Sequence, residues 1–468
     1  RSFYNLIKHV NRSIVHIYIQ LITIERYVMD LKDLRINGKR LQNTLEEMAK
    51  IGATPGGGVQ RLTLTDEDKQ ARDLFISWLN ELDLDVTIDE MGNIFGKRPG
   101  KNNDLPPVMS GSHIDSQPKG GRFDGILGVM GPLEVLRTLH ENNIETERPL
   151  VIVDWTNEEG SRFAPAMVAS GVWAGALERD WAYDRTDING KRLEDELIRI
   201  GYKGTVPAKK WPAHCYYEYH IEQGPILERE GKQIGAPKGI LCLHWYDVYL
   251  EGEANQVGPT PMEGRHDALC AAAEMILKVN DLPDRMGGNM VATVGEIQNY
   301  PNSRNIIPDK VHFTVDIRSW DDDHALMAWD VVRKDFEDIA ARRGCPIKIE
   351  ETWRVEHSPF DENRVQLIMQ SAESLGYSYL HMVSGAGHDA SYMNQGESHD
   401  AFVEYGEVAA VRVRRPEVRN ALSNQTMQEP VGMALIAGLF TSKACVNVGP
   451  PLSCSGPNIG SPSPAVPQ

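Results

Sequence analysis

The chain lacks several features that mark membrane, disulfide-rich or nucleic-acid-binding proteins. No run of about 18 apolar residues occurs, so we expect no membrane-spanning helix. Six cysteines are spread over 468 residues without a CxxC pair, which predicts reduced thiols, no disulfides and no cysteine-bound zinc. The net charge of −17 argues against nucleic acid or an anionic membrane surface as a partner. The composition favours a cytoplasmic enzyme with a small-molecule substrate.

The length and the N-terminus set further limits. With 468 residues and 41% hydrophobic content, the chain exceeds what one core usually supports, so two domains are expected. Residues 1–33 precede the recognisable pattern of helices and strands, and we expect them to form an N-terminal extension of the catalytic domain. Residues 1–24 carry three basic side chains and no acid, which makes a mitochondrial presequence the alternative to the cytoplasm. The segment is too rich in β-branched residues for a convincing amphipathic helix.

The segment 34–230 alternates helical and strand-like patterns. Thr65 is placed to cap a helix, and 83–96 has the pattern of a hairpin. A strand ending at His113, a helix over 125–143 and the buried apolar run of 149–160 follow in order. Strand, helix, strand predicts a right-handed parallel crossover, and hence an α/β domain with a mainly parallel sheet flanked by helices.

The order of elements changes at about residue 231 and returns at about 350. Strands and two long helices over 231–349 predict an inserted α+β domain, with helices over one face of a small antiparallel sheet. The segment 350–394 completes the first domain. The proline- and serine-rich segment 395–468 is atypical and predicts a disordered tail.

Carboxylates and imidazoles recur beside glycine or at strand ends, in GSHIDSQPKGGRFDG, DWTNEEGSRF and YHIEQGP. Two divalent ions held close together need such an inventory, with one carboxylate to bridge them and another to act as base. The pattern therefore predicts a dinuclear metallohydrolase. The side chains concerned are His113, Asp115, Asp124, Glu158, Glu159 and His220.

Each motif also has a structural interpretation when it is taken singly. An isolated pair of glutamates is more often a solvated acidic turn. Glu158 and Glu159 follow a buried apolar strand, where unpaired carboxylates would be costly without a cation, so the functional interpretation is preferred. Asp115 lies two residues after His113, where its carboxylate can orient the imidazole. Asp124 lies in a glycine-rich turn suited to bridging two ions.

Two further side chains are candidates for substrate binding. Arg318 projects from the uncovered face of the strand 310–319, where its planar guanidinium could clamp a substrate carboxylate or pair with Asp316 or Asp321. His388 lies in the glycine-rich GAGHDA segment and could be a ligand, a transition-state donor or a loop residue.

The strings GSHIDSQPKGGRFDGILGV, WTNEEGSRF, HIEQGPILE, PNSRNIIP and SGAGHDA together resemble the amidase, hydantoinase and carbamoylase branch of the dinuclear zinc peptidase superfamily. That branch includes N-carbamoyl-L-amino-acid hydrolases, β-ureidopropionase and allantoate amidohydrolase. The resemblance implies a zinc-peptidase-like catalytic domain and an inserted lid that also forms a homodimer. It further implies hydrolysis of an N-carbamoyl amino acid to the amino acid, carbon dioxide and ammonia.

The resemblance also implies roles by motif position. Two divalent ions are expected, zinc first, with manganese or cobalt as alternatives. Glu158 would be the general base, and Asp124 would bridge the ions. The other expected metal ligands are His113, Glu159 and His220. The side chains expected to bind substrate or stabilise the tetrahedral intermediate are Gln223, Asn305, Arg318 and His388.

The chain departs from the family pattern in two places. The family has histidine where this chain has Gln256, which cannot carry positive charge, so we expect weaker oxyanion stabilisation and reduced turnover. The family also ends with a strand and a GxSH segment whose histidine completes the second metal site. Here VRV stands at that distance after His388, and His399 comes too early. The pattern predicts an incomplete second site, with a frameshift, retained intron or mis-joined exon as its cause.

Three functional hypotheses follow. The first is a metal-dependent amidohydrolase that acts on a carbamoyl or ureido carboxylate. The second is a catalytically impaired homologue that acts as a dimer partner or ligand binder. The third is an aminoacylase or dipeptidase, which the HIEQGP segment disfavours.

Overall fold

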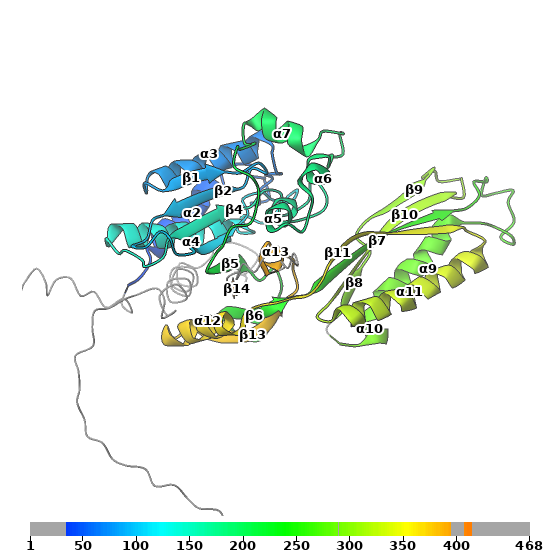
Figure 1. Cartoon of the computed structure of the whole chain (residues 1–468). Helices are drawn as coiled ribbons and strands as arrows, with labels where there is room; N and C mark the ends of the chain where they lie inside the picture. Colours follow the sequence, from blue (N-terminus) through cyan, green and yellow to red (C-terminus); the bar gives the residue numbers. More distant parts are fainter. Residues whose placement is uncertain (1–33, 289, 395–406, 414–468) are drawn as a thin grey trace, which may run out of the picture.

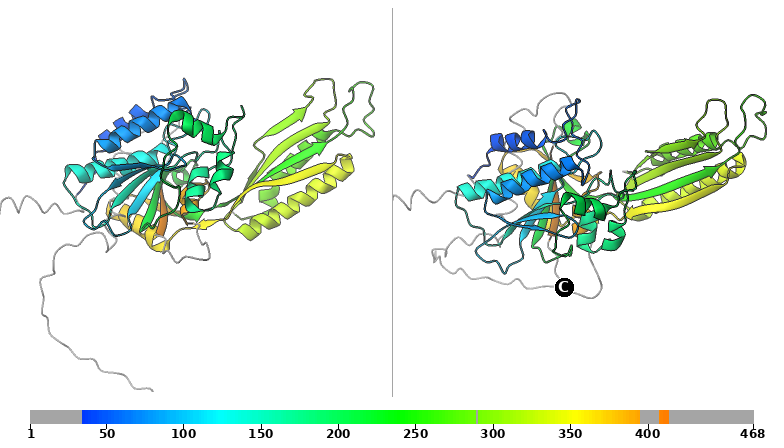
Figure 2. Two further views of the ribbon diagram at one scale, coloured as in Figure 1. Left: turned by 45° about the horizontal axis from the view of Figure 1, so that its top comes forward. Right: turned by 90° about the horizontal axis from the view of Figure 1, so that it is seen from above.

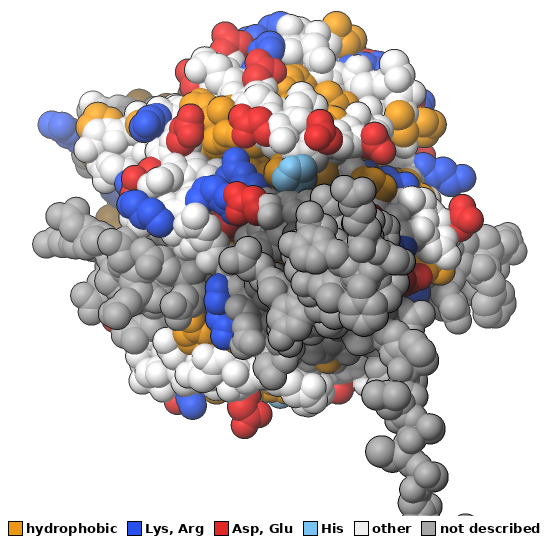
Figure 3. Space-filling model, turned by 90° about the vertical axis from the view of Figure 1, so that its left-hand side faces the viewer, with side chains coloured by type: hydrophobic (Ala, Val, Ile, Leu, Met, Phe, Trp, Pro, Cys, Tyr) orange, Lys and Arg blue, Asp and Glu red, His pale blue; other side chains and the backbone are white. Residues whose placement is uncertain are grey.

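A computed structural model of the chain describes residues 34–288, 290–394 and 407–413. Two β-sheets organise them, a larger one on the left of Figure 1 and a smaller one that projects to the right with its helices. No helix of the described residues is long and apolar enough to cross a membrane. On the face drawn in Figure 3, acidic and basic side chains are interspersed over the described surface.

The larger sheet is parallel at its centre and antiparallel toward its edges. Its strands within the described residues are β1 (Asp85–Ile88), β2 (Ile94–Arg98), β3 (Val108–Ser112), β4 (Leu150–Asp154), β5 (Cys215–Ile221), β6 (Ile234–Ile240), β12 (Ser358–Pro359), β13 (Tyr379–Ser384) and β14 (Glu407–Val413). They lie in the order β1-β2-β4-β3-β5-β14-β6-β12, with β13 also paired to β6. The parallel pairs β3–β4, β3–β5 and β5–β14 form the centre.

Helices flank this sheet, as Figure 2 shows. They are α2 (Gly38–Met48), α3 (Asp66–Asn80), α4 (Ile126–Glu141), α5 (Val168–Ala174), α6 (Arg179–Tyr183), α7 (Leu193–Ile200), α8 (Ile226–Arg229), α12 (Glu362–Ser374) and α13 (Ala390–Asn394). Helix α4 connects β3 to β4 and packs on β3, β4 and β5. Its apolar stripe of Val129, Leu133 and Leu136 is buried in the main core. The expected strand–helix–strand unit is confirmed.

Local sequence patterns begin and end several of these elements as predicted. The Thr65 side chain accepts the main-chain N–H of Asp68 at 3.3 Å and begins α3. The expected hairpin is the antiparallel pair β1–β2. Every residue of β4 is buried, in agreement with its unbroken apolar run.

The smaller sheet is antiparallel in the order β11-β7-β10-β8, with β9 also paired to β10. Its elements are β7 (Cys242–Glu251), α9 (Ala268–Asn280), α10 (Leu282–Met286), β8 (Val291–Thr293), β9 (Ile297–Tyr300), β10 (Lys310–Ser319), α11 (Asp322–Arg343) and β11 (Ile347–Val355). Alternate residues of β10, from Val311 to Ile317, are buried with α9 and α11 in a second core. The expected α+β arrangement, with helices over one face, is therefore observed.

The chain passes between the two sheets after Ile240 and again after Val355, because β6 and β12 pair in the larger sheet while β7 and β11 pair in the smaller one. The sequence pattern places these passages at residues 231 and 349. A change in the order of elements reveals an insertion, but it does not reveal which sheet a strand joins.

One expectation for the C-terminal region is wrong. The sequence predicts no strand after residue 395, yet Glu407–Val413 forms β14, parallel to β5 and antiparallel to β6. Val408, Ala409, Ala410 and Val411 form an apolar run without alternation, so the segment lacks the pattern that identifies strands nearer the N-terminus. Strand β14 takes its place from neighbours on both sides, which no local pattern records. The rest of the expected tail, with His399, lies outside the described residues.

Candidate active site

Three neighbouring parallel strands end at one edge of the larger sheet and present the candidate residues there. His113 directly follows β3, Glu158 and Glu159 lie on the loop after β4, and His220 is near the end of β5. In open sheets of this kind, ligands gather outside the carboxyl ends of the strands. The structure brings these side chains together although they come from segments far apart in sequence.

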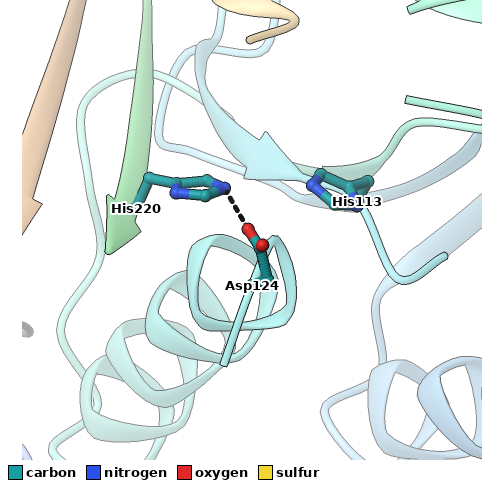
Figure 4. Close-up of side chains that lie close together, drawn as sticks. All are labelled: His113, Asp124 and His220. Carbon is teal, nitrogen blue, oxygen red and sulfur yellow. Dashed lines mark ion pairs between the residues drawn. The ribbon is translucent and has the colours of Figure 1, made fainter. Parts of the chain in front are cut away.

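His113, Asp124 and His220 form a compact cluster at this edge. One ligand atom from each lies within 4.8 Å of the others, and Figure 4 shows Asp124 between the two imidazoles. His220 Nε2 is 3.2 Å from Asp124 Oδ1. Two imidazoles and a carboxylate are a ligand set for a divalent transition metal.

The turn before α4 must have glycine at position 125. Gly125 has a φ of +65°, and a Cβ atom there would lie 2.2 Å from the ring of His113. Any side chain at this position would push His113 out of the cluster. The main-chain N–H of Gly125 also reaches the cluster, because it lies 3.2 Å from His220 Nε2.

Main-chain carbonyl groups orient both imidazoles. His113 Nδ1 is 2.9 Å from the carbonyl oxygen of Asp115, and His220 Nδ1 is 2.9 Å from that of Ile221. A donor–acceptor pair at Nδ1 fixes the tautomer and directs Nε2 toward a ligand. Burial lowers the pKa of His113, which favours the neutral ring that binds metals.

The expectation for Asp115 needs correction. Its main-chain carbonyl, rather than its carboxylate, accepts from His113, and the carboxylate oxygen lies 3.6 Å from Nδ1. The carboxylate instead accepts the main-chain N–H groups of Glu158 at 3.2 Å and Glu159 at 3.4 Å. Two main-chain N–H groups give the buried Asp115 carboxylate two hydrogen bonds, whereas one imidazole would give it one. Asp115 therefore joins the loop after β3 to the loop after β4.

The adjacent side chains of Glu158 and Glu159 point in different directions and contact different partners. Glu158 Oε2 is 3.2 Å from His113 Nε2, and Glu159 Oε2 accepts from Gln117 at 2.8 Å. Burial, with the negative charge of Asp389, raises the pKa of Glu158 well above its usual range. Burial and the charge of Asp124 raise the pKa of Glu159 to about 8.

A cation would relieve this crowding of carboxylates. Glu159 Oε1 is buried and has no hydrogen-bond partner among the described residues. A buried carboxylate oxygen without a partner is costly unless a cation neutralises it. The residues present therefore fit a divalent metal.

A cavity of about 240 Å³ opens beside this cluster. Arg318 reaches it from β10, and its guanidinium donates to Asp316 at 2.7 Å and to the carbonyl of Gly385 at 3.0 Å. Of the two ion pairs considered for Arg318 from sequence, the structure contains the one with Asp316. The full lining is His113, Gln117, Glu158, Glu159, Ala166, Met167, His220, Gln223, Leu243, Trp245, Arg318, Trp353, Ala386, Gly387 and His388.

The structure gathers three of the five expected substrate-binding side chains, counting Gln256, in this cavity: Gln223, Arg318 and His388. Gln223 donates to both carboxylate oxygens of Asp124 at 3.0 Å, and the ring of His388 lies 4.4 Å from that of His220. Gln256 and Asn305 lie on loops of the smaller-sheet unit outside the cavity lining, joined by the isolated bridge between Gln256 and Ile306.

Several residues of the cavity wall were not predicted from the sequence, among them Gln117, Trp245 and Trp353. Gln117 holds Glu159, and Trp245 and Trp353 pack with ring centres 4.7 Å apart on neighbouring strands. Gln117 lies in the same GSHIDSQ segment as His113, so its place beside a predicted ligand could have identified it as a site residue. The tryptophans come together only through the register of β7 with β11.

The chain is similar to known amidohydrolases along most of its length. It is 45% identical over 358 residues to an N-carbamoyl-L-amino-acid amidohydrolase of Rhizobium meliloti, covering 76% of this chain and 86% of the relative. It is 33% identical over 359 residues to an allantoate amidohydrolase of Bacillus subtilis, covering 75% and 86%. A solved amidase of the hydantoinase/carbamoylase family from Burkholderia vietnamiensis matches with a TM-score of 0.82 and 43% identity, over 89% of this chain and all of that one.

A family match covers the site itself. Residues 109–415 match peptidase family M20/M25/M40, a range that contains every side chain of the cavity lining. The similarity of the solved amidase supports the same assignment at the level of the fold. The chain belongs to peptidase family M20/M25/M40, among the amidohydrolases of its hydantoinase and carbamoylase branch.

Proposed function

We propose that this chain hydrolyses N-carbamoyl-L-amino acids to the amino acid, carbon dioxide and ammonia. One observation supports the proposal above all. The metal-ligand cluster at His113 and His220, the carboxylate of Glu158 and the guanidinium of Arg318 all lie at one cavity. Relatives named for carbamoyl-amino-acid and allantoate hydrolysis support the choice of a ureido carboxylate as substrate.

The proposed cofactor is a pair of divalent metal ions, with zinc first and manganese or cobalt as alternatives. His113, Asp124, Glu159 and His220 would hold them, since their donor atoms suit these metals. When bound, such ions polarise the scissile carbonyl and make water more acidic. The C-terminal histidine that completes one of the two metal sites in the family is not found among the described residues. The other metal site, at His113, Asp124 and His220, is therefore the more complete.

Glu158 is the proposed general base. Its carboxylate lies within 3.2 Å of His113 Nε2, at the wall of the cavity, so it faces the position where water would attack. The raised pKa makes it a stronger base than an exposed carboxylate, which suits a group that takes up a proton and passes it on. Glu158 takes the proton from the attacking water and delivers it to the nitrogen of the departing group.

Arg318 is the proposed partner of the substrate carboxylate. Asp316 and the Gly385 carbonyl hold its guanidinium at the cavity wall. The ring of His388 lies beside His220, where it can donate to the developing oxyanion. Gln223 is held on Asp124 and can present its amide oxygen to a ureido N–H.

We further propose that two copies of the chain associate through the smaller-sheet unit. Apolar side chains exposed on that unit support the proposal, because exposed apolar surface often marks an interface. A second copy could supply Gln256 and Asn305, which lie outside the cavity of their own chain. The large exposed apolar side chains of this unit are Tyr249, Val257, Met262, Leu277, Val291, Ile297, Tyr300 and Met327.

A substrate panel tests the proposed activity. The purified chain, loaded in turn with zinc, manganese or cobalt, is assayed with N-carbamoyl-L-amino acids, N-carbamoyl-β-alanine, allantoate and N-acetyl-L-amino acids. We expect carbamoyl substrates to be hydrolysed and Glu158→Gln to lower kcat by about 10²- to 10⁴-fold with metal content unchanged. Hydrolysis of acetyl substrates alone would make the chain an aminoacylase. Retained metal and substrate binding without turnover would make it an impaired homologue.

A further inference from the structure

Strand β7 carries different chemistry on its two faces. Leu243 and Trp245 point to the candidate active site and line its cavity. Successive residues of a strand face opposite sides, so Cys242 and His244 share the other face. Cys242 belongs to the core formed with α11. The second face therefore brings a thiol and an imidazole to the N-terminal end of that helix.

Asp322, in the first turn of α11, completes a second group of potential metal ligands. One ligand atom from each of Cys242, His244 and Asp322 lies within 4.8 Å of the others. His244 Nε2 is 3.9 Å from Asp322 Oδ1. Thiolate sulfur, imidazole nitrogen and carboxylate oxygen are the three donor types that zinc binds in proteins.

His244 supplies an independent indication of a missing ligand. Its side chain is 0% exposed, and neither ring nitrogen makes a hydrogen bond within the described residues. Buried polar groups are nearly always paired, and each exception requires an explanation. Burial also lowers the pKa of His244, which leaves the ring neutral and able to bind a metal. Arg354, on the same face in the sheet register, is engaged with Glu351 at 2.5 Å.

His357 holds the carboxylate of this group in place. Its main-chain N–H donates to Asp322 Oδ1 at 3.1 Å, and its Nδ1 contacts Asp322 Oδ2. Cys242 lies directly after the first passage between the sheets, and His357 lies on the second. Both connections between the larger and smaller sheets therefore meet at Asp322.

We propose that Cys242, His244 and Asp322 form a zinc site at this junction, separate from the candidate active site, with His357 holding the Asp322 carboxylate in place. The thiol S–H bond breaks as the sulfur–zinc bond forms, and the proton passes to solvent. This proposal reverses the expectation, drawn from the absence of CxxC pairs, that no cysteine binds zinc. It does not depend on the proposed activity.

The position gives the ion a structural consequence. It would fasten the start of β7 to the first turn of α11 and, through His357, to the second connection between the sheets. Leu243 and Trp245 lie on the same strand, so the ion would also fix one wall of the cavity. The ion would thus hold the two connections between the sheets close together.

Cobalt distinguishes this site from the candidate active site. Cobalt(II) bound to a thiolate absorbs in the near ultraviolet by sulfur-to-metal charge transfer, and the proposed active-site ligands include no cysteine. The full-length chain, stripped of metal, is titrated with cobalt chloride. We expect the thiolate band to grow and then saturate as cobalt fills the sites of the chain, and zinc to abolish it. The band should be lost in Cys242→Ser and retained in Cys270→Ser, which changes an exposed thiol of α9.

Two further variants keep the outcome decisive. His244→Asn tests the site without removing a thiol, and it should weaken or abolish the band. Glu158→Gln, in the candidate active site, should leave the band unchanged. Absence of a band in the folded wild type, or its persistence in both Cys242→Ser and His244→Asn, would overturn the proposal.

Discussion

The main-chain N–H of Glu158 donates to the carboxylate of Asp115 over 3.2 Å, across 43 residues of sequence. The next residue, Glu159, donates to the same carboxylate at 3.4 Å. One side chain thus fixes the backbone of both glutamates. In the proposed mechanism Asp115 is a positioning residue, because it acts on the base and on a metal ligand without touching substrate.

Asp115→Asn should therefore lower kcat more than it raises KM. An asparagine can accept only one of the two N–H groups well, and its own amide would oppose the other. Misplacement of the base should reduce kcat by about 10²-fold. Steady-state kinetics with an N-carbamoyl-L-amino acid measure both parameters. The matched control is Asp89→Asn, which changes another buried carboxylate that accepts two main-chain N–H groups, outside the cavity. A loss confined to KM would argue against the positioning role.

Arg318→Lys should raise KM with little change in kcat. Lysine cannot contact Asp316 and a substrate carboxylate with the planar fork that arginine has. Loss of a charge-assisted hydrogen bond predicts a KM about 10- to 100-fold higher. The amide analogue of the substrate, which has no carboxylate, should be insensitive to the change. Arg333→Lys on the exposed face of α11 serves as the control. An equal effect on both substrates would remove Arg318 from carboxylate recognition.

Residues at the strand ends could be predicted from the sequence, whereas the hydrogen-bond partners of Asp115 could not. His113, the glutamates and His220 each follow or end an apolar strand, and parallel strands present such residues at one edge. That much needs only local patterns. The true partners of Asp115 depend on how two loops lie beside each other, which no spacing within one segment records. The same reason explains why Trp245 and Trp353 were missed.

Strand β14 and Arg318 show two other limits. The strand takes its place from pairing with β5 and β6, although its own sequence has no clear alternation. The sequence left two roles open for Arg318, an ion pair within the chain or the binding of a substrate carboxylate. The structure contains the ion pair with Asp316 and also places the side chain at the cavity, so the two alternatives do not exclude each other.

Ile297→Lys should disrupt the proposed dimer. Ile297 is 47% exposed on β9, and Leu277 is 61% exposed on α9. A lysine in an apolar interface would bury an unpaired charge, which is costly. Sedimentation of the wild type should give twice the monomer mass, and Ile297→Lys or Leu277→Lys should give the monomer. Ile188→Lys, at a fully exposed isoleucine of the larger unit, should leave the mass unchanged. A monomeric wild type would reject the dimer outright.

Arg72→Met should destabilise the larger unit strongly. The Arg72 guanidinium is 0% exposed and donates to Asp68 at 2.8 Å and to the carbonyl of Gly92 at 2.8 Å. Its removal leaves a buried carboxylate without its cation, which costs about 3–5 kcal/mol. Urea unfolding measures the loss. Lys69→Met, which breaks an exposed pair with Asp73, should change stability by less than about 0.5 kcal/mol. Similar values for the two variants would contradict the argument.

Asp89 should make the stability of the fold depend on pH. Its carboxylate is 1% exposed and accepts the main-chain N–H groups of Met91 and Asn93 at 2.9 and 3.0 Å. Burial outweighs these hydrogen bonds and raises its pKa to about 7. The folded chain therefore keeps a proton that the unfolded chain loses near pH 4.

The sign follows from this difference in proton binding. A raised carboxyl pKa contributes stability that is complete below about pH 4 and is lost as the pH rises toward about 7. The stability of the wild type relative to Asp89→Asn should accordingly fall by about 2–3 kcal/mol between about pH 5 and pH 8, as an upper bound. Urea unfolding of both proteins across this range, with metals removed by a chelator, measures the difference. Since asparagine does not titrate, a constant difference between the two proteins would mean that Asp89 is ionised throughout.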